Sequence, residues 1–216
     1  MIRHGLAPVQ RDAAAALGLQ RTMRAPGVAL TFDDGPHPEG TPAVLEVLAA
    51  AGAVATFFVV GEQVARRPQL VAEIIGGGHE VALHGYEHRL QLRFGAREVA
   101  EDLERGVTAV REATGGAPPV WHRPPYGIYS AAGLEWVRAA GMRPLLWSRW
   151  GKDWRALTTP DRIARRALRN VIAGDVILLH DADFYSASGS HRRTVAALAP
   201  MLAELNARKL DTVLPV

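Results

Sequence analysis

Short, continuously apolar runs alternate along this chain with longer segments that have the hydrophobic spacing of amphipathic helices. Apolar runs of this kind predict strands that are buried on both faces, as in a parallel sheet. The predicted strands are Val28–Phe32, Ala55–Val60, His79–Leu83, Val120–His122, Met142–Trp147, Asp175–Leu179 and Thr212–Leu214. The predicted helices are Pro42–Ala51, Gln69–Ile75, Ala96–Ala113, Ala131–Ala140, Pro160–Ile172 and Arg192–Arg208.

Residues that typically begin and end helices support several of these boundaries. Thr41 and Thr159 each precede a proline, the order of an N-cap residue followed by proline in the first helical turn. The glycines Gly76–Gly78 predict the end of the second helix. An alanine-rich run, Ala13–Leu19, predicts one more short helix ahead of the first strand.

Repeated strand-then-helix units predict an α/β fold built on a parallel sheet. About seven such units in 216 residues favour closure of the sheet into a distorted (β/α) barrel of about seven parallel strands. An open, doubly wound sheet is the alternative architecture. Because the composition does not change along the chain, we expect a single domain over residues 28–216, preceded by a partly helical N-terminal extension over residues 1–27.

Composition narrows the classes of protein and of site. Hydrophobic residues make up 48% and charged residues 22% of the chain, which is typical of a globular protein and excludes a disordered or fibrous one. Because cysteine is absent, any metal must be held by His, Asp or Glu, and disulfides and cysteine nucleophiles are excluded. The net charge is +3, and the arginines are scattered rather than grouped, which argues against a nucleic-acid partner.

The hydrophobic runs also bear on location. No run approaches the ~18 apolar residues that a membrane span needs. The alanine-rich run near the N-terminus is at the lower limit of length for the core of a signal peptide, and no further hydrophobic residues extend it. We therefore expect a cytoplasmic protein or a secreted one whose leader has been removed, two cases that composition does not separate.

Polar residues follow most of the predicted strands at the point where each strand ends. In a parallel barrel the carboxyl ends of the strands share one face, where active sites are built. The residues in question are Asp33 and Asp34 after the first strand, His84 and His88 after the third, Arg123 after the fourth, Asp153 after the fifth and His180 after the sixth. We expect these groups, although far apart in sequence, to converge on one site.

Two pairs among these residues, His84 with His88 and Asp33 with Asp34, suggest a metal site. His84 and His88 are four residues apart, so one helical turn would place both imidazoles on a common face. With one carboxylate they would form a three-ligand site with open positions, suited to Zn, Co or Fe(II). The adjacent carboxylates of Asp33 and Asp34 repel each other unless a cation lies beside them, so one could bind the metal while the other acts as a base.

Each pair also has a structural interpretation. Asp33 and Asp34 could form a turn ahead of Gly35 and Pro36, and a turn would also aim their carboxylates. A lone His-x-x-x-His spacing is often a coincidence. The remaining histidines are assigned no chemistry: His79 begins its strand and is expected to be structural, and His4, His37 and His191 are expected to be ordinary surface or loop residues.

Five segments in order resemble the motifs of a known family. They are Thr31–Pro36, His84–His88, Arg123–Gly127, Asp153–Trp154 and Leu178–Asp181. Together they resemble the polysaccharide deacetylases, the group with the NodB homology domain, also called carbohydrate esterase family four. The resemblance runs from about Val28 to the C-terminus. It implies a NodB-like distorted barrel that holds one divalent metal, usually zinc or cobalt.

The resemblance also implies a role for each matching residue. The metal ligands would be Asp34, His84 and His88. The general base would be Asp33, oriented by Arg123, and the general acid would be His180, tuned by Asp153. The backbone N–H of Tyr126 would stabilise the oxyanion, and Leu178 and Trp154 would wall the pocket for the acetyl methyl group. We further expect Arg123 to keep Asp33 ionised and His180 to have a pKa near its ordinary ~6.5.

Three positions depart from the family pattern. Gly85 stands where Ser or Thr is usual, which could loosen the orientation of the metal ligands. His122 stands where an aromatic residue is common and Trp150 where an aspartate is common, and both are expected to alter the sugar subsites. None of these changes removes a ligand, the base or the acid, so we expect an active enzyme.

The leading hypothesis is a metal-dependent hydrolase that removes acetyl groups from N-acetylglucosamine units in oligomers, in polymers such as chitin or peptidoglycan, or in glycoconjugates. One alternative is an O-acetyl esterase on acetylated polysaccharide, and another is a barrel that binds sugar without turnover. A non-haem Fe(II) oxygenase would use the same ligand types, but that class is typical of antiparallel jelly rolls. The expected partner is a carbohydrate, without nucleic acid or a membrane span.

Overall fold

The computed structural model describes residue 14 and residues 16–216. Its described part contains one sheet of seven strands, and every strand pair is parallel. The strands are β1 (Ala29–Asp33), β2 (Thr56–Val59), β3 (Glu80–Leu83), β4 (Trp121–His122), β5 (Arg143–Pro144), β6 (Arg149–Trp150) and β7 (Val176–His180). Their order across the sheet is β5-β4-β3-β2-β1-β7-β6.

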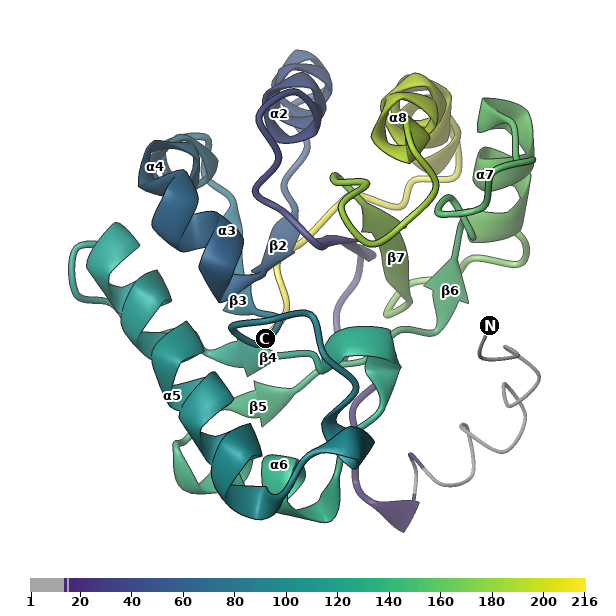
Figure 1. Ribbon diagram of the computed structural model, residues 1–216. Coiled ribbons are helices and arrows are strands. Elements are labelled where there is room, and N and C mark those ends of the chain that lie inside the picture. Colours follow the sequence, from purple (N-terminus) through teal and green to yellow (C-terminus); the bar gives the residue numbers. More distant parts are fainter. Residues whose placement is uncertain (1–13, 15) are drawn as a thin grey trace.

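Helices form a ring around the outside of the curled sheet (Figure 1). They are α2 (Gly40–Ala50), α3 (Gly61–Arg66), α4 (Pro68–Gly76), α5 (Ala96–Ala113), α6 (Ala131–Ala139), α7 (Pro160–Ala167) and α8 (Ser190–Ala207), with short 3-10 turns at Gln91–Arg93 and Pro125–Gly127. Since all helices lie on the outer side of a curled parallel sheet, the distorted barrel is confirmed and the doubly wound alternative is wrong.

Alternation along the strands divides the core into two layers. Outward residues such as Leu30 and Phe32 pack with helix residues such as Leu48 in the larger hydrophobic cluster. Inward residues form a smaller cluster that includes Ala29 and Phe58. At the carboxyl ends of β1, β3, β4 and β7 the residues are polar: Asp33, His84, Arg123 and His180. The sheet therefore presents a polar site at one end of a thin apolar interior.

The segment 142–151 runs from one edge of the sheet to the other, so the strand predicted at Met142–Trp147 is wrong in extent. Arg143 and Pro144 pair with β4, whereas Arg149 and Trp150 pair with β7. Between them, Leu146 donates its N–H to the carbonyl of Gln20 and Ser148 donates to that of Val176. One apolar run therefore serves two edges and splits into two short strands.

Other predicted boundaries also shift. Thr212 forms only a single bridge with Val28, so the predicted strand Thr212–Leu214 is not part of the sheet. Helix α3 was not predicted because its six residues are too few to show a helical period. Helix α7 ends at Ala167, five residues before the predicted end at Ile172.

Thr41 is not the N-cap of α2, although Thr159 does cap α7 as predicted. The Thr41 hydroxyl accepts a hydrogen bond from the His37 N–H and donates one to Asp181. The N-terminus of α2 is instead bound by His37, whose Nδ1 accepts hydrogen bonds from the N–H groups of Glu39 at 3.1 Å and Gly40 at 2.9 Å. A side chain from outside the helix thus takes over the capping role.

The segment ahead of β1 is tied to the sheet. Gln20 and Thr22 form bridges with Leu145 and Asp175, and Met23 belongs to the inner hydrophobic cluster. Of the helix predicted at Ala13–Leu19, residues 13 and 15 lie outside the described part; Ala14 and Ala16 are helical, and Leu17 and Gly18 form a turn. His4, predicted at the surface, lies outside the described residues. The boundary between residues 27 and 28 stays a prediction. Within the described part of the chain, no helix is long and apolar enough to cross a membrane.

Candidate active site

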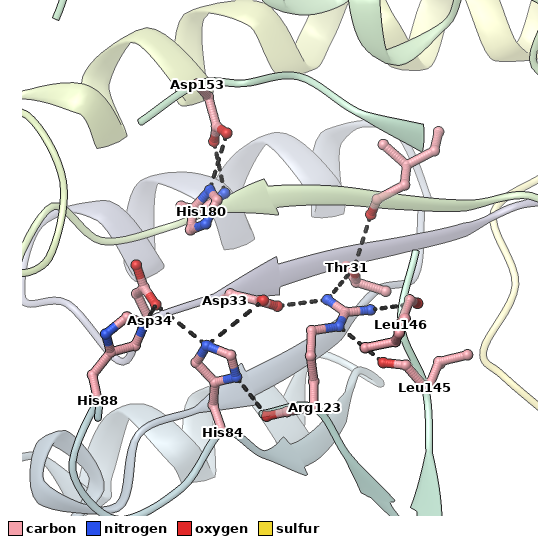
Figure 2. Close-up of polar contacts among 11 residues, drawn as sticks. Thr31, Asp33, Asp34, His84, His88, Arg123, Leu145, Leu146, Asp153 and His180 are labelled. Atoms are coloured by element: carbon pink, nitrogen blue, oxygen red, sulfur yellow. Dashed lines mark hydrogen bonds and ion pairs between the residues drawn. The ribbon is translucent and has the colours of Figure 1, made fainter. Parts of the chain in front are cut away.

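The polar residues predicted to converge do so at the carboxyl ends of the strands (Figure 2). Asp33 ends β1, His84 directly follows β3, Arg123 directly follows β4 and His180 ends β7. Strands β4 and β3 are neighbours in the sheet, as are β1 and β7, and β2 lies between the two pairs. The side chains of these four residues are almost fully buried, so the site is an internal one reached from the end of the barrel.

The two adjacent aspartates reach the same site because the backbone turns between them. Side chains of consecutive strand residues point to opposite faces. Strand β1 ends at Asp33, however, and Asp34 has a left-handed φ of 80°, which Asp tolerates better than most residues. Both carboxylates consequently lie near the ring of His84: Oδ2 of Asp33 is 3.8 Å and Oδ1 of Asp34 is 3.5 Å from its Nε2.

Asp34, His84 and His88 form a group that could hold a metal ion. Oδ1 of Asp34 lies 3.5 Å from Nε2 of His84 and 3.3 Å from Nε2 of His88. Ligand atoms on a tetrahedral ion with bonds of about 2.0–2.1 Å are separated by about 3.4 Å. The three residues therefore have the donor types and the spacing that a zinc-like ion needs.

The hydrogen bonds around this group leave its donor atoms available. Asp34 Oδ1 is buried and has no hydrogen-bond partner among the described residues. Nδ1 of His84 lies 2.7 Å from the carbonyl oxygen of Arg123, so it carries the proton and Nε2 keeps its lone pair. Burial, reinforced by His88, lowers the pKa of His84 to about 3 and keeps its ring neutral. Burial alone would raise the pKa of Asp34, but the imidazoles, His88 foremost, hold it well below its ordinary value.

The two histidines converge through a loop and not through the helical turn that their spacing suggested. Residues 84–88 form no helix. Gly85 adopts a left-handed φ of 81°, and the carboxylate of Asp102 on α5 accepts hydrogen bonds from the N–H groups of Tyr86 and Glu87, both at 3.0 Å. A side chain from a distant helix thus shapes the loop.

Arg123 is completely buried and fixes Asp33. Its Nη1 donates to Oδ1 of Asp33 at 2.6 Å and to the Thr31 hydroxyl at 2.9 Å, while Nε and Nη2 donate to the carbonyls of Leu145 and Leu146. The orientation predicted for Asp33 is therefore present. Burial raises the pKa of Asp33 to about 6, because desolvation outweighs the opposing charge of Arg123. Arg123 alone would lower the pKa of Asp33, so burial makes Asp33 a stronger base than the predicted pairing with Arg123 implies.

His180 pairs with Asp153 on the other side of the site. Its Nδ1 lies 3.0 Å from Oδ1 of Asp153, and its backbone N–H donates to Oδ2 at 2.7 Å. Thr194 donates its hydroxyl to the same Oδ2. Burial disfavours the imidazolium, but Asp153, aided by Asp34, outweighs this and raises the pKa of His180 to about 10. The expectation of an ordinary pKa is therefore wrong, because the charges of Asp153 and Asp34 outweigh the cost of burying the imidazolium.

The expected pocket residues lie around these groups. Leu178 pairs with Thr31 in the sheet and is 3% exposed. The Trp154 ring lies edge-on to His180, with ring centroids 5.5 Å apart. The Trp150 ring contacts Trp154 in turn, with centroids 5.4 Å apart. Tyr126 has a left-handed φ of 62° and its ring lies edge-on to His88. The oxyanion role of its N–H and the subsite role of Trp150 stay predictions.

The sugar-subsite role expected for His122 is wrong. This side chain is fully buried, and its Nδ1 lies 2.7 Å from the hydroxyl of Tyr129. Burial lowers the pKa of His122 to about 3, so the ring is a neutral member of the interior. A residue without solvent exposure cannot contact a sugar.

Several residues that support the site were not singled out from the sequence. Thr31 could have been found, since it lies two positions before Asp33 and therefore on the same face of β1. Asp102 and Thr194 carry no such signal, because they come from helices remote in sequence; they hold the ligand loop and the carboxylate of Asp153. From the sequence, Tyr185 is an aromatic residue that could stack on a sugar face, and in the structure its ring stacks on the imidazole of His88.

His37 lies in a loop, as expected, and His191 lies at the start of α8, but the expectation of ordinary surface residues is wrong. They are 7% and 5% exposed, their rings lie 4.4 Å apart, and both approach the carboxylate of Asp183. Like the first group, these three have donor atoms within metal-binding distance of one another. Nδ1 of His37, however, accepts hydrogen bonds from two backbone N–H groups, so the ring proton is on Nε2. The nitrogen that faces Asp183 therefore has no lone pair for a metal.

Known proteins share this arrangement. The profile of the polysaccharide deacetylase family matches residues 20–145. A chitooligosaccharide deacetylase of Sinorhizobium fredii is 39% identical over 189 residues, which make up 85% of this chain and 87% of that protein. A peptidoglycan-N-acetylglucosamine deacetylase of Bacillus cereus is 35% identical over 180 residues, or 82% of this chain and 81% of that protein.

A solved structure gives the same result. A family 4 carbohydrate esterase from Streptomyces lividans, in complex with acetate, superposes with a TM-score of 0.78 at 30% identity, covering 88% of this chain and 93% of the other. The family profile, the curated relatives and the barrel agree with one another. The chain therefore belongs to the polysaccharide deacetylase family.

Proposed function

We propose that this protein is a metal-dependent deacetylase that hydrolyses the acetamido group of N-acetylglucosamine units in an oligomer or in a polymer such as chitin or peptidoglycan. The observation that carries the proposal is the convergence of Asp33, the Asp34–His84–His88 group and His180 at one end of the barrel. The names of the relatives support the substrate class, since one is a chitooligosaccharide deacetylase and the other a peptidoglycan-N-acetylglucosamine deacetylase.

Asp34, His84 and His88 would hold one divalent ion, with zinc the best match to two imidazoles and a carboxylate and cobalt a close second. Such an ion polarises a carbonyl oxygen and lowers the pKa of a bound water from 15.7 toward ~7. The neutral ring of His84 and the ionised carboxylate of Asp34 are the protonation states that this role requires.

Asp33 takes a proton from the attacking water. Its pKa of about 6 leaves the carboxylate mostly ionised at neutral pH while keeping it a better proton acceptor than an ordinary aspartate. Arg123 holds Oδ1, so Oδ2 is the oxygen that faces the ligand group. The base is therefore oriented before the substrate arrives, which removes an entropic cost from the reaction.

His180 gives a proton to the nitrogen of the leaving amine. Its raised pKa keeps it protonated at neutral pH, and its hydrogen bond to Asp153 directs Nε2 away from that carboxylate. The N–H of Tyr126 stabilises the negative charge that develops on the carbonyl oxygen. Leu178 and Trp154 enclose the acetyl methyl group, which limits the size of the acyl group.

Acetate release tests the proposal. The purified protein is incubated with N-acetylglucosamine oligomers, with a chelator, and with zinc or cobalt added back; acetylated xylan is a parallel substrate. We expect acetate from the oligomers, loss of activity with the chelator and recovery with either ion. Acetate from xylan alone would show an O-acetyl esterase, and tight sugar binding without acetate in any condition would show a non-catalytic barrel.

The variant Asp33→Asn separates the base from the metal ligands. We expect it to retain one equivalent of metal and to lose roughly 10²- to 10⁴-fold in kcat, the usual contribution of general base catalysis. Metal content is measured by elemental analysis and the rate by acetate release. A variant that kept close to the full rate would show that Asp33 is not the base.

A further inference from the structure

The two imidazoles of the ligand group are held in different ways. Histidines that bind a metal usually donate their second ring N–H to a fixed acceptor, which sets the orientation of the ring. His84 follows this rule through the carbonyl of Arg123. His88 does not: its Nδ1 is buried and has no hydrogen-bond partner within the described part of the chain. Something other than a hydrogen bond must orient the His88 ring.

Two tyrosine rings contact His88. The Tyr185 ring stacks on it almost in parallel, with centroids 4.2 Å apart and planes 8° apart. Tyr126 meets it edge-on, with centroids 4.7 Å apart and an interplanar angle of 66°. Stacked and edge-to-face ring pairs at these distances are favourable arrangements beyond the area that they bury. The His88 ring is therefore confined on one face by Tyr185 and bordered by Tyr126.

Tyr185 is itself held in place by hydrogen bonds to α3. It lies in the β7–α8 loop, and its hydroxyl donates to Oε1 of Glu62 at 2.6 Å and accepts from Nε2 of Gln63 at 3.3 Å. Both partners belong to α3. Burial, with the Glu62 carboxylate, raises the pKa of Tyr185, so the hydroxyl remains a donor. At the base of the loop, Asp183 accepts the N–H of Gly189 at 2.7 Å.

We propose that Tyr185 is a positioning residue for the metal centre: its ring, stacked on His88, orients that imidazole for metal binding, and the hydrogen bond to Glu62 is secondary to the stacking. The inference rests on the proposed function for the ion itself, and it adds a residue outside the five matching motifs. Its ring stacks on the imidazole of His88, so its effect on the ligand group passes through His88.

Metal affinity tests this role independently of turnover. The metal-free protein is titrated with Zn²⁺ in competition with a chromophoric chelator, and the Co²⁺-loaded protein is examined by visible absorption, which reports the geometry of the ligands. The variants are Tyr185→Leu, which removes the ring, Tyr185→Phe, which keeps it, and Phe184→Leu. The last is the matched control, since Phe184 lies in the same loop, packs on His37 with ring centroids 4.8 Å apart and meets Tyr185 only edge-on at 6.2 Å.

We expect Tyr185→Leu to weaken Zn²⁺ binding about 10- to 100-fold, in line with the loss of other groups that orient metal ligands, and to change the Co²⁺ spectrum. Tyr185→Phe should bind within about 3-fold of the wild type, and Phe184→Leu should be unchanged. If Tyr185→Leu fails to fold, Tyr185→Ser takes its place with the same expected result.

The outcomes separate this inference from the proposed function. A wild-type protein that binds neither ion would overturn the proposed metal centre. A wild type that binds Zn²⁺, together with a folded Tyr185→Leu of equal affinity and unchanged spectrum, would overturn the role of Tyr185 alone. Equal weakening in Tyr185→Phe and Tyr185→Leu would also overturn it, because the stacked ring would then not be the feature that matters.

Discussion

Two groups with the same composition, two histidines and one aspartate, lie in the described part of the chain. One consists of Asp34, His84 and His88; the other consists of His37, Asp183 and His191. Both are largely buried; the first group follows strands β1 and β3, whereas the second comes from the segments after β1 and β7 and from the start of α8. By donor count alone they are equivalent metal sites.

The hydrogen bond made by the remote ring nitrogen distinguishes them. In the first group, Nδ1 of His84 donates to a carbonyl, so the Nε2 that faces Asp34 has a lone pair. In the second, Nδ1 of His37 accepts two backbone N–H groups at the start of α2, so the Nε2 that faces Asp183 carries a proton. The first group is suited to bind an ion, and the second to cap a helix and tie two loops together. The comparison shows that residue types and distances do not define a metal site unless the tautomers agree.

The largest expected effect tests this comparison directly. His88→Ala should reduce the metal content from about one equivalent to near zero, because two ligands hold a divalent ion far less tightly than three. His191→Ala, its matched variant in the second group, should keep about one equivalent. Elemental analysis after dialysis against limiting Zn²⁺ measures both. A loss of metal in His191→Ala equal to that in His88→Ala would show that the tautomer argument is wrong.

The pair of His180 and Asp153 extends the comparison to an imidazole outside the ligand group. Here Nδ1 of His180 is hydrogen-bonded to the carboxylate of Asp153. Asp153 raises the pKa of His180, and a general acid works only while protonated. Asp153→Asn removes this charge and lowers the pKa, so the alkaline fall in kcat should begin about one pH unit or more below that of the wild type. The pH profile of acetate release measures this shift. An unchanged alkaline limb with normal metal content would show that His180 does not supply the proton.

The smallest effect concerns the helix cap. His37→Ala leaves the N–H groups of Glu39 and Gly40 without their acceptor and should lower the free energy of unfolding by about 1 kcal/mol. Metal content should not change. Denaturant unfolding measures the difference, with His37→Asn as the control that restores a short acceptor side chain. If the variant had unchanged stability but reduced metal content, His37 would be a metal ligand and not a helix cap.

The barrel and most of the site residues could be predicted because their signals are local. Apolar runs such as the one ending at Asp33 mark strands, and in a parallel sheet the residues that follow such strands must share one face. The convergence of Asp33, His84, Arg123 and His180 therefore followed from sequence order alone. The strands β5 and β6 could not be separated in the same way, since both come from one apolar run and only the positions of β4 and β7 divide it.

Sequence alone thus determined the fold class, the end of the barrel that carries the site and the residue types available for chemistry, because periodicity and chain order act over short distances. Tertiary structure alone decided the protonation of those residues: the raised pKa of Asp33 and of His180, and the different tautomers at His84 and His37. Each of these depends on burial and on partners such as Asp153, which lies 27 residues from His180 along the chain. Electrostatic and hydrogen-bonding environments are set by what folding brings into contact, and neighbours in sequence do not reveal them.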